Sequence, residues 1–172
     1  VERSRGLGDV YKRQARGMAD EAMPYRGILY VGLMLTDTGP QVIEFNCRLG
    51  DPEAQVILPR LRSDFVAAML ATIEGTLGHV SLRWDERSAV TVVMAAKGYP
   101  GSYEKGSVIA GAETAAGDDV MLFHAGTKID ADGTLRAHGG RVLAVTGLGR
   151  DVGAARGAAY GAVDKIGWPG GF

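Results

Sequence analysis

The sequence predicts an α+β fold, in which a hairpin and two helices precede a strand-rich region closed by one more helix. Short apolar runs typical of buried strands recur after residue 27, and clusters of turn-forming residues separate them. Other segments carry an apolar residue every three or four positions, which is typical of amphipathic helices. The order strand, strand, helix, helix, strands, helix lacks a regular βαβ alternation, so we expect α+β rather than α/β.

The first predicted element is a hairpin. Residues 28–35 form an apolar run that only Gly32 interrupts. The cluster 36–40, Thr-Asp-Thr-Gly-Pro, favours a turn, and residues 41–46 are then the returning strand.

Two helix starts follow the hairpin. Asp51 precedes Pro52, which suits an N-cap followed by the first helical position. Ser63 and Asp64 open the second helix. Its predicted apolar face consists of Phe65, Met69 and Ile73, together with Val66 and Leu70.

The polar stretch 79–88 is the best candidate for a domain boundary. Beyond it, residues 89–96, 120–124 and 141–146 predict buried strands, with a turn at 130–133. The closing helix is predicted over 152–166, with one side formed by Val152, Ala155, Ala159, Val163 and Ile166. Glycines recur every four residues in this helix (Gly153, Gly157, Gly161), and each costs a helix up to ~1 kcal/mol relative to alanine. We therefore expect the glycine face to pack closely on the sheet.

Composition narrows the classes of function. The chain is 46% hydrophobic, which suits a packed core, and its net charge of −1 lacks the basic excess of a nucleic-acid or acidic-membrane surface. No apolar run reaches the ~20 residues that span a bilayer. The single cysteine, Cys47, cannot form an internal disulfide. These features predict a cytoplasmic protein without nucleic-acid or membrane partners.

Both ends of the chain look cut, and we interpret the chain as a fragment of a longer protein. Residues 1–14 are highly charged and show no clear period. We expect them to be a non-native or disordered extension, with a frayed native helix end as the alternative.

The densest group of chemically useful residues is 44–53, Glu-Phe-Asn-Cys-Arg-Leu-Gly-Asp-Pro-Glu. Alternation along a strand places Glu44, Asn46 and Arg48 on one face, with Phe45 and Cys47 on the opposite, core-facing side. A carboxylate and an amide oxygen are ligands suited to Mg²⁺, and an arginine beside them can neutralise a phosphoryl group. The alternative is an edge strand whose polar face is only solvated.

Several longer segments resemble the phosphoribosylamine–glycine ligases of the ATP-grasp superfamily. They are 27–36 (GILYVGLMLT), 44–48 (EFNCR), 50–55 (GDPEAQ), 97–100 (KGYP), 123–127 (FHAGT) and 139–143 (GGRVL). They occur in the order found in that family, and the resemblance covers residues 15–172. It implies the end of an ATP-grasp domain over 15–80 and a small strand-rich α+β carboxy-terminal domain over 81–172.

The resemblance also implies an activity. Glycine is joined to 5-phosphoribosylamine at the expense of ATP, through glycyl phosphate, giving glycinamide ribonucleotide, ADP and phosphate. Glu44 and Asn46 match the family's ligands for Mg²⁺ or Mn²⁺, and Arg48 matches an arginine near the phosphates, so that we expect it to bind ATP and assist catalysis. The family suggests a monomer. Two alternatives remain, namely another ATP-grasp carboxylate–amine ligase and a folded fragment that catalyses nothing.

Three other patterns are interpreted structurally. Cys47 is expected in the core rather than as a nucleophile. His79, His124 and His138 lack the companion ligands of a zinc site. Residues 146–153 imitate a dinucleotide-binding fingerprint, but their last glycine is one position late, so we expect a strand-to-helix turn capped by Asp151.

Overall fold

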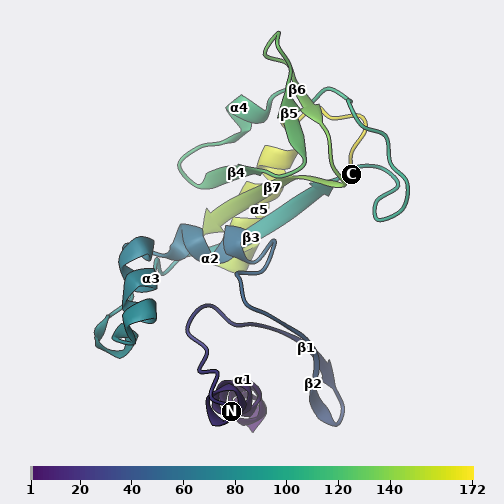
Figure 1. Ribbon diagram of the computed structural model, residues 1–172. Helices are drawn as coiled ribbons and strands as arrows, with labels where there is room; N and C mark the ends of the chain where they lie inside the picture. The colour runs from purple at the N-terminus through teal and green to yellow at the C-terminus, as the bar shows by residue number, and fades with distance from the viewer. Residues whose placement is uncertain (1) are drawn as a thin grey trace. The chain divides into compact units, whose positions relative to one another are not determined.

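The computed structural model describes residues 2–172 and confirms a mixed α+β architecture (Figure 1). The chain divides into two compact units. The amino-terminal unit comprises the residues up to 51 and 63–83, and the carboxy-terminal unit comprises 52–62 and 84–172. The sequence analysis placed the domain boundary at residue 80, whereas residues 52–62 belong to the carboxy-terminal unit. The domain ranges stay a prediction.

The amino-terminal unit contains two longer helices and a hairpin. Helix α1 (Glu2–Asp20) is followed by strands β1 (Tyr30–Thr36) and β2 (Gly39–Asn46), which pair antiparallel as predicted. Helix α3 (Phe65–Glu74) and a 3₁₀ turn (Leu77–His79) complete the unit. Residues 2–14, expected to be disordered, lie within α1, and their origin stays a prediction.

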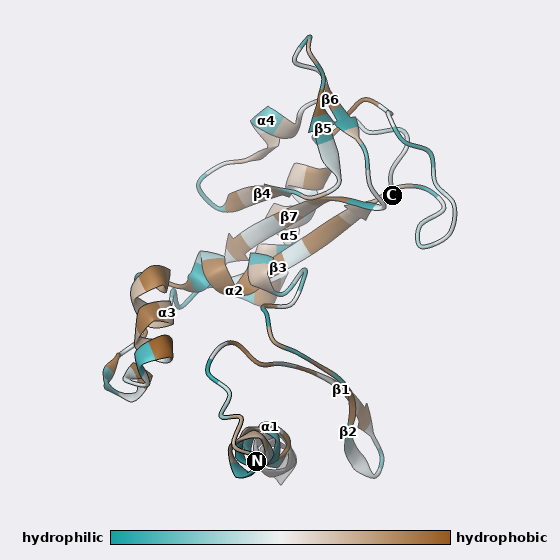
Figure 2. Ribbon diagram, in the orientation of Figure 1, coloured by the Kyte–Doolittle hydropathy of each residue, from teal (hydrophilic) through white to brown (hydrophobic). Residues whose placement is uncertain are grey.

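Helix α3 begins as predicted, but its packing differs from the prediction. The side chain of Asp64 accepts a hydrogen bond from the backbone N–H of Ala67 at 2.9 Å, which caps the helix. The buried positions are Ala68 and Ala71, whereas most of the predicted apolar face is exposed: Phe65, Val66, Leu70 and Ile73. Figure 2 shows the apolar colouring of this helix. Periodicity identified the helix, but it did not reveal which side is covered within this chain.

The carboxy-terminal unit is built on a three-stranded antiparallel sheet in the order β3-β7-β4 (Figure 1). Its strands are β3 (Ser88–Ala95), β4 (Val120–His124) and β7 (Arg141–Gly149), close to the predicted ranges. A small hairpin of β5 (Thr127–Ile129) and β6 (Leu135–Ala137) and the short helix α4 (Ala112–Ala115) were not predicted.

Two helices cover the two faces of this sheet. Helix α5 (Val152–Val163) packs on β7 and β3, and the backbone of β7 at Gly147 approaches it closely. On the other face, the Thr146 hydroxyl donates to the carbonyl of Gln55 in α2 (Ala54–Arg60) at 2.8 Å. Since consecutive residues of a strand point to opposite faces, β7 is covered on both sides. This explains why residues 142–148 are all buried.

The start of α2 differs from the prediction. Asp51 and Pro52 were expected to be the N-cap and the first helical residue, but the helix begins at Ala54 with Glu53 as its N-cap. Pro52 accepts from the N–H of Gln55 at 3.1 Å, so a tight turn precedes the helix. Proline suits such a turn as well as it suits a first helical turn, which is why the sequence did not separate the two.

The glycines that recur every four residues in α5 were predicted to pack closely on the sheet, and this prediction is wrong. Gly157 and Gly161 are exposed, and a Cβ atom at either position would meet nothing within 4 Å. The close approach is made instead by the glycines of β7. A Cβ at Gly147 would lie 2.3 Å from the Ala155 carbonyl oxygen, and one at Gly149 would lie 2.4 Å from the Ala155 nitrogen. The strand, not the helix, therefore supplies the small residues at this contact.

A buried carboxylate ties residues 60–62 to the start of β3. Asp85 accepts hydrogen bonds from the backbone N–H and guanidinium of Arg87, the latter at 2.9–3.3 Å, and from the guanidinium of Arg62. The backbone N–H of Asp85 donates a further hydrogen bond to the carbonyl oxygen of Arg60, at 2.7 Å. The hydrogen bonds from Arg87, followed by those from Arg62, hold the pKa of Asp85 well below its ordinary value.

We expect Asp85→Asn to lower the stability of the carboxy-terminal unit at neutral pH. A carboxylate with a depressed folded-state pKa contributes stability above its unfolded pKa of 3.8, and this contribution is lost as the pH falls through the folded value. The difference in urea midpoint between wild type and variant should therefore be full near neutral pH and should shrink below about pH 4. Glu86→Gln, an exposed neighbouring carboxylate, is the matched control. A difference that grows on acidification would contradict this role for Asp85.

Candidate functional site

The candidate site lies at the end of β2, where the structure defines the register of the hairpin. Glu44 pairs with Gly32, and Asn46 pairs with Tyr30. The pairing shifts between Gly32 and Leu33, so that Ile43 is an extra residue directly before Glu44. Bulges of this kind change the direction of neighbouring side chains and recur next to active sites. No register shift separates Glu44 from Asn46, but Asn46 lines a hollow facing α1 together with Phe45 and Cys47, whereas Glu44 does not line it.

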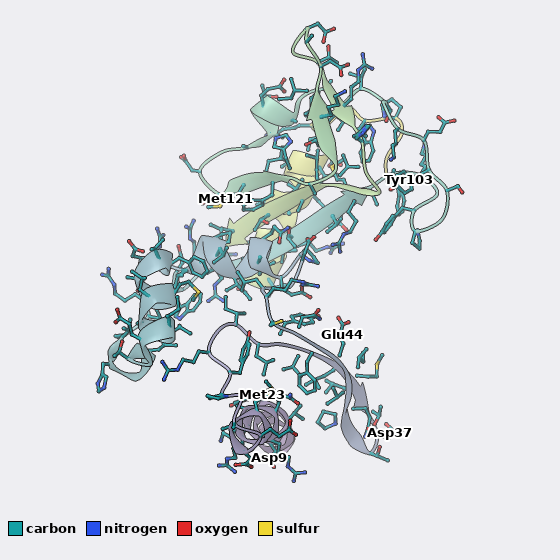
Figure 3. All side chains as sticks on the ribbon, in the orientation of Figure 1. Asp9, Met23, Asp37, Glu44, Tyr103 and Met121 are labelled. Atoms are coloured by element: carbon teal, nitrogen blue, oxygen red, sulfur yellow. The ribbon has the colours of Figure 1, made fainter. Side chains whose placement is uncertain are left out.

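Glu44 is exposed, and no described residue donates a hydrogen bond to its carboxylate or forms an ion pair with it. Figure 3 shows its side chain projecting from the hairpin on the side away from α1. An exposed carboxylate without a protein partner is available to a cation or to a donor group of a ligand.

Asn46 is partly buried, and its Nδ2 atom is buried without a hydrogen-bond partner among the described residues. The residue lines a hollow of about 190 Å³ between the hairpin and α1. An unpaired buried amide group costs free energy, on the order of 1–3 kcal/mol. Such a group is retained more readily where a ligand completes its interactions.

Arg48 follows the end of β2 and is exposed. Its Nη1 donates to the neighbouring carbonyl of Leu49 at 2.9 Å. The guanidinium therefore has donors left for an anionic ligand. Among the described interactions, Arg48 and Glu44 form no ion pair or hydrogen bond, so their joint action stays a prediction.

The expected core on the other side of this strand is only partly formed. Phe45 is 39% exposed, and Cys47 is exposed, although both were predicted to be buried. Both side chains line the same hollow as Met18 of α1, next to Asn46. The alternation rule placed Asn46 on the face opposite Phe45 and Cys47. All three residues line the hollow, because the strand ends at Asn46 and the alternation of faces ends with it.

The donor set suits a hard cation that keeps other ligands. Glu44 and Asn46 supply at most a carboxylate and an amide oxygen, the ligand types preferred by Mg²⁺ and Mn²⁺. Within the described part of the chain, no group of three or more His, Cys, Asp or Glu residues is placed to hold a metal ion. Two protein oxygens therefore fit a cation whose remaining positions are filled by phosphate and water.

The fingerprint-like segment at 146–153 is a strand-to-helix turn. Asp151 caps α5 by accepting from the N–H of Ala154 at 2.8 Å. A Cβ atom at Gly147 or Gly149 would overlap backbone atoms of α5, so there is no space at this contact for a phosphate group. Separately, no helix in the described chain has the length and apolar character required to cross a membrane.

The pairing of Gly32 with Glu44 was not foreseen from the sequence. The signal for it was the single glycine within the apolar run at 28–35. Its significance depends on the cross-strand register, which the bulge at Ile43 changes.

Family models match two successive parts of the chain. Residues 3–54 match the phosphoribosylglycinamide synthetase ATP-grasp (A) domain. Residues 89–172 match the phosphoribosylglycinamide synthetase C domain.

Curated relatives extend the similarity over nearly the whole chain. A phosphoribosylamine–glycine ligase of Mesorhizobium japonicum is 52% identical over 168 residues, which are 98% of this chain and 39% of that protein. A chloroplastic phosphoribosylamine–glycine ligase of Arabidopsis thaliana is 51% identical over 161 residues, covering 91% of this chain and 30% of that protein. The chain thus spans well under half the length of these two relatives.

A solved structure agrees with these matches. The crystal structure of phosphoribosylamine–glycine ligase from Thermotoga maritima superposes with a TM-score of 0.80 at 37% identity. The superposition covers 97% of this chain and 41% of that chain.

Proposed function

The chain belongs to the phosphoribosylglycinamide synthetase family, and from this premise we propose that it is part of an ATP-dependent ligase that joins glycine to 5-phosphoribosylamine. The observation that carries the proposal is the succession of two matches, to the ATP-grasp domain and then to the C domain of one enzyme. The exposed carboxylate of Glu44, at the end of a strand inside the first match, supplies a chemically suitable group.

The proposed reaction has two steps. A carboxylate oxygen of glycine attacks the γ-phosphorus of ATP, which forms glycyl phosphate and releases ADP. The amine of 5-phosphoribosylamine then attacks the acyl carbon, and phosphate leaves as the amide of glycinamide ribonucleotide forms. Proteins promote such transfers mainly by positioning the reactants and stabilising charge, so that no nucleophilic side chain is needed.

In this proposal, Glu44 and Asn46 are the residues that would hold Mg²⁺ or Mn²⁺. When bound, the cation neutralises charge on the phosphate oxygens of ATP. Arg48 adds a guanidinium whose donors match phosphate oxygens. The unpartnered carboxylate of Glu44 supports its assignment. The unpaired atom of Asn46 is its Nδ2, a hydrogen-bond donor, so the assignment of Asn46 rests on its match to the family motif. We also propose a monomer that works in the cytoplasm, whereas the Arabidopsis relative is named as chloroplastic.

The proposal predicts opposite results for two forms of the chain. We expect ligase activity when the chain replaces the matching segment of the 52% identical Mesorhizobium relative, and none from the 172-residue chain alone. Two protein oxygens on an open surface compete poorly with water for Mg²⁺, which dehydrates reluctantly. The assay supplies ATP, Mg²⁺, glycine and freshly generated phosphoribosylamine, and measures ADP and glycinamide ribonucleotide.

Three outcomes are informative in this assay. Product from the 172-residue chain above a no-protein control would contradict the expected dependence on the rest of the ligase. ADP release from the chimera that requires an acid other than glycine would identify a different carboxylate–amine ligase. A folded chimera without activity on any acid would contradict the proposal.

A further inference from the structure

Gly32 has no conformational reason to be glycine. Its φ lies outside the left-handed region, in contrast to that of Gly27 and Gly39 in the same unit. Glycine in the interior of a strand weakens the strand, because it has no side chain to pack and loses more backbone entropy on folding. The position therefore requires another explanation, which lies across the hairpin.

The space beside Gly32 is occupied by the Glu44 side chain. A Cβ atom at position 32 would lie 3.1 Å from Cγ of Glu44, tighter than an ordinary van der Waals contact. The other nearby atoms, Cε1 of Tyr30 and the backbone nitrogen of Glu44, would be at ordinary distances of 3.6 and 3.7 Å. The two residues are direct cross-strand partners, so a side chain at 32 would share the face of Glu44. Glu44 is thus the one side chain that must move if residue 32 acquires a Cβ.

We propose that Gly32 is a positioning residue for Glu44: the missing side chain at 32 leaves the volume through which the Glu44 stem runs, and this sets the direction of its carboxylate. The inference rests on the proposed function of Glu44 as a cation ligand. An alanine at 32 displaces Cγ of Glu44 by a few tenths of an ångström, and a valine forces a different rotamer. Misplacement of a reacting group or ligand by about 1 Å can reduce a rate by about 100-fold.

A purely structural role and a positioning role predict different effects of Gly32→Val on cation binding. If Gly32 only filled a strand position, valine would raise strand propensity and leave cation use unchanged. If Gly32 positions Glu44, valine should impair cation use while thermal stability stays equal or rises. Gly78 is a matched control, because it lies in the same unit, has open space around it and has no left-handed φ.

The experiment compares Gly32→Ala, Gly32→Val, Glu44→Gln, the double variant Gly32→Val/Glu44→Gln and Gly78→Val in the full-length chimera. Mn²⁺ affinity in the presence of ATP is measured by electron paramagnetic resonance, alongside the Mg²⁺ dependence of turnover and the thermal midpoint. We expect Gly32→Val to weaken Mn²⁺ binding by about 10-fold or more, as loss of a ligand's supporting contact does, and Gly32→Ala to weaken it less. Gly78→Val should change nothing.

The double variant separates positioning from unrelated effects. In the Glu44→Gln background, Gly32→Val should add no further loss of Mn²⁺ affinity, because its target is already removed. Additive losses, or unchanged Mn²⁺ affinity in both Gly32 variants, would overturn the inference while leaving the proposed function intact. If Gly32→Val does not fold, Gly32→Ala decides by the same criteria. Normal Mn²⁺ affinity and turnover in Glu44→Gln would instead overturn the proposed role of Glu44 as a cation ligand, on which the inference rests, while a chimera without ligase activity would overturn the proposed function.

Discussion

We expect replacement of Glu44 with glutamine to lower turnover of the full-length chimera by about 100-fold or more, with little change in its thermal midpoint. Glutamine keeps the size of the side chain but removes its charge, and loss of even a supporting contact around a metal costs about 10- to 100-fold in affinity or activity. The fold should tolerate the change, because no described residue bonds the Glu44 side chain. The measurement is kcat at saturating ATP, glycine and Mg²⁺, with a thermal melt of each variant.

The control for this variant is Glu74→Gln, which removes another exposed carboxylate from the same unit. It should leave turnover unchanged. Asn46→Leu should reproduce the loss seen with Glu44→Gln, because it removes the second oxygen ligand at nearly constant size. Turnover of Glu44→Gln near that of wild type at saturating Mg²⁺ would remove Glu44 from the site.

Replacing Gly147 with alanine destabilises the carboxy-terminal unit by about 1–3 kcal/mol or more, the range for overpacking a tight core. The new Cβ would lie 2.3 Å from the Ala155 carbonyl oxygen and 2.5 Å from the Ala159 nitrogen. Both are backbone atoms of α5, so no side-chain rotation relieves the clash and the helix must move away from the sheet. Urea unfolding monitored by circular dichroism measures the loss.

The matched controls are Gly157→Ala and Gly161→Ala in the facing helix. A Cβ atom at either position meets nothing within 4 Å, and both residues are exposed. Each substitution should stabilise the unit by up to ~1 kcal/mol, because alanine is the better helix former. If Gly147→Ala is neutral, or if the helix variants destabilise, then the assignment of the close contact to the strand rather than to the helix is wrong.

Local sequence signals were sufficient for much of the fold. Short apolar runs bounded by turn residues predicted the strands at 120–124 and 141–146 and the hairpin after residue 28, and the structure extends the second of these strands to Gly149. The sequence predicted a helix start at Ser63 and Asp64 and an N-cap at Asp151, and the side chains of Asp64 and Asp151 each accept from an N–H three residues later. The motif at 44–48 marked the candidate ligands, since chemically suitable residues recur at strand spacing. All these features depend on interactions within a few residues.

Other features depend on residues that are distant in the sequence. The bulge at Ile43 and the pairing of Gly32 with Glu44 arise from the register between two strands. Asp85 forms an ion pair with Arg62, which lies more than twenty positions earlier in the chain. Periodicity showed that α3 and α5 have apolar or small-residue faces, but it did not show which faces are covered. Burial is decided by what packs opposite a residue, and a local pattern contains no record of that neighbour.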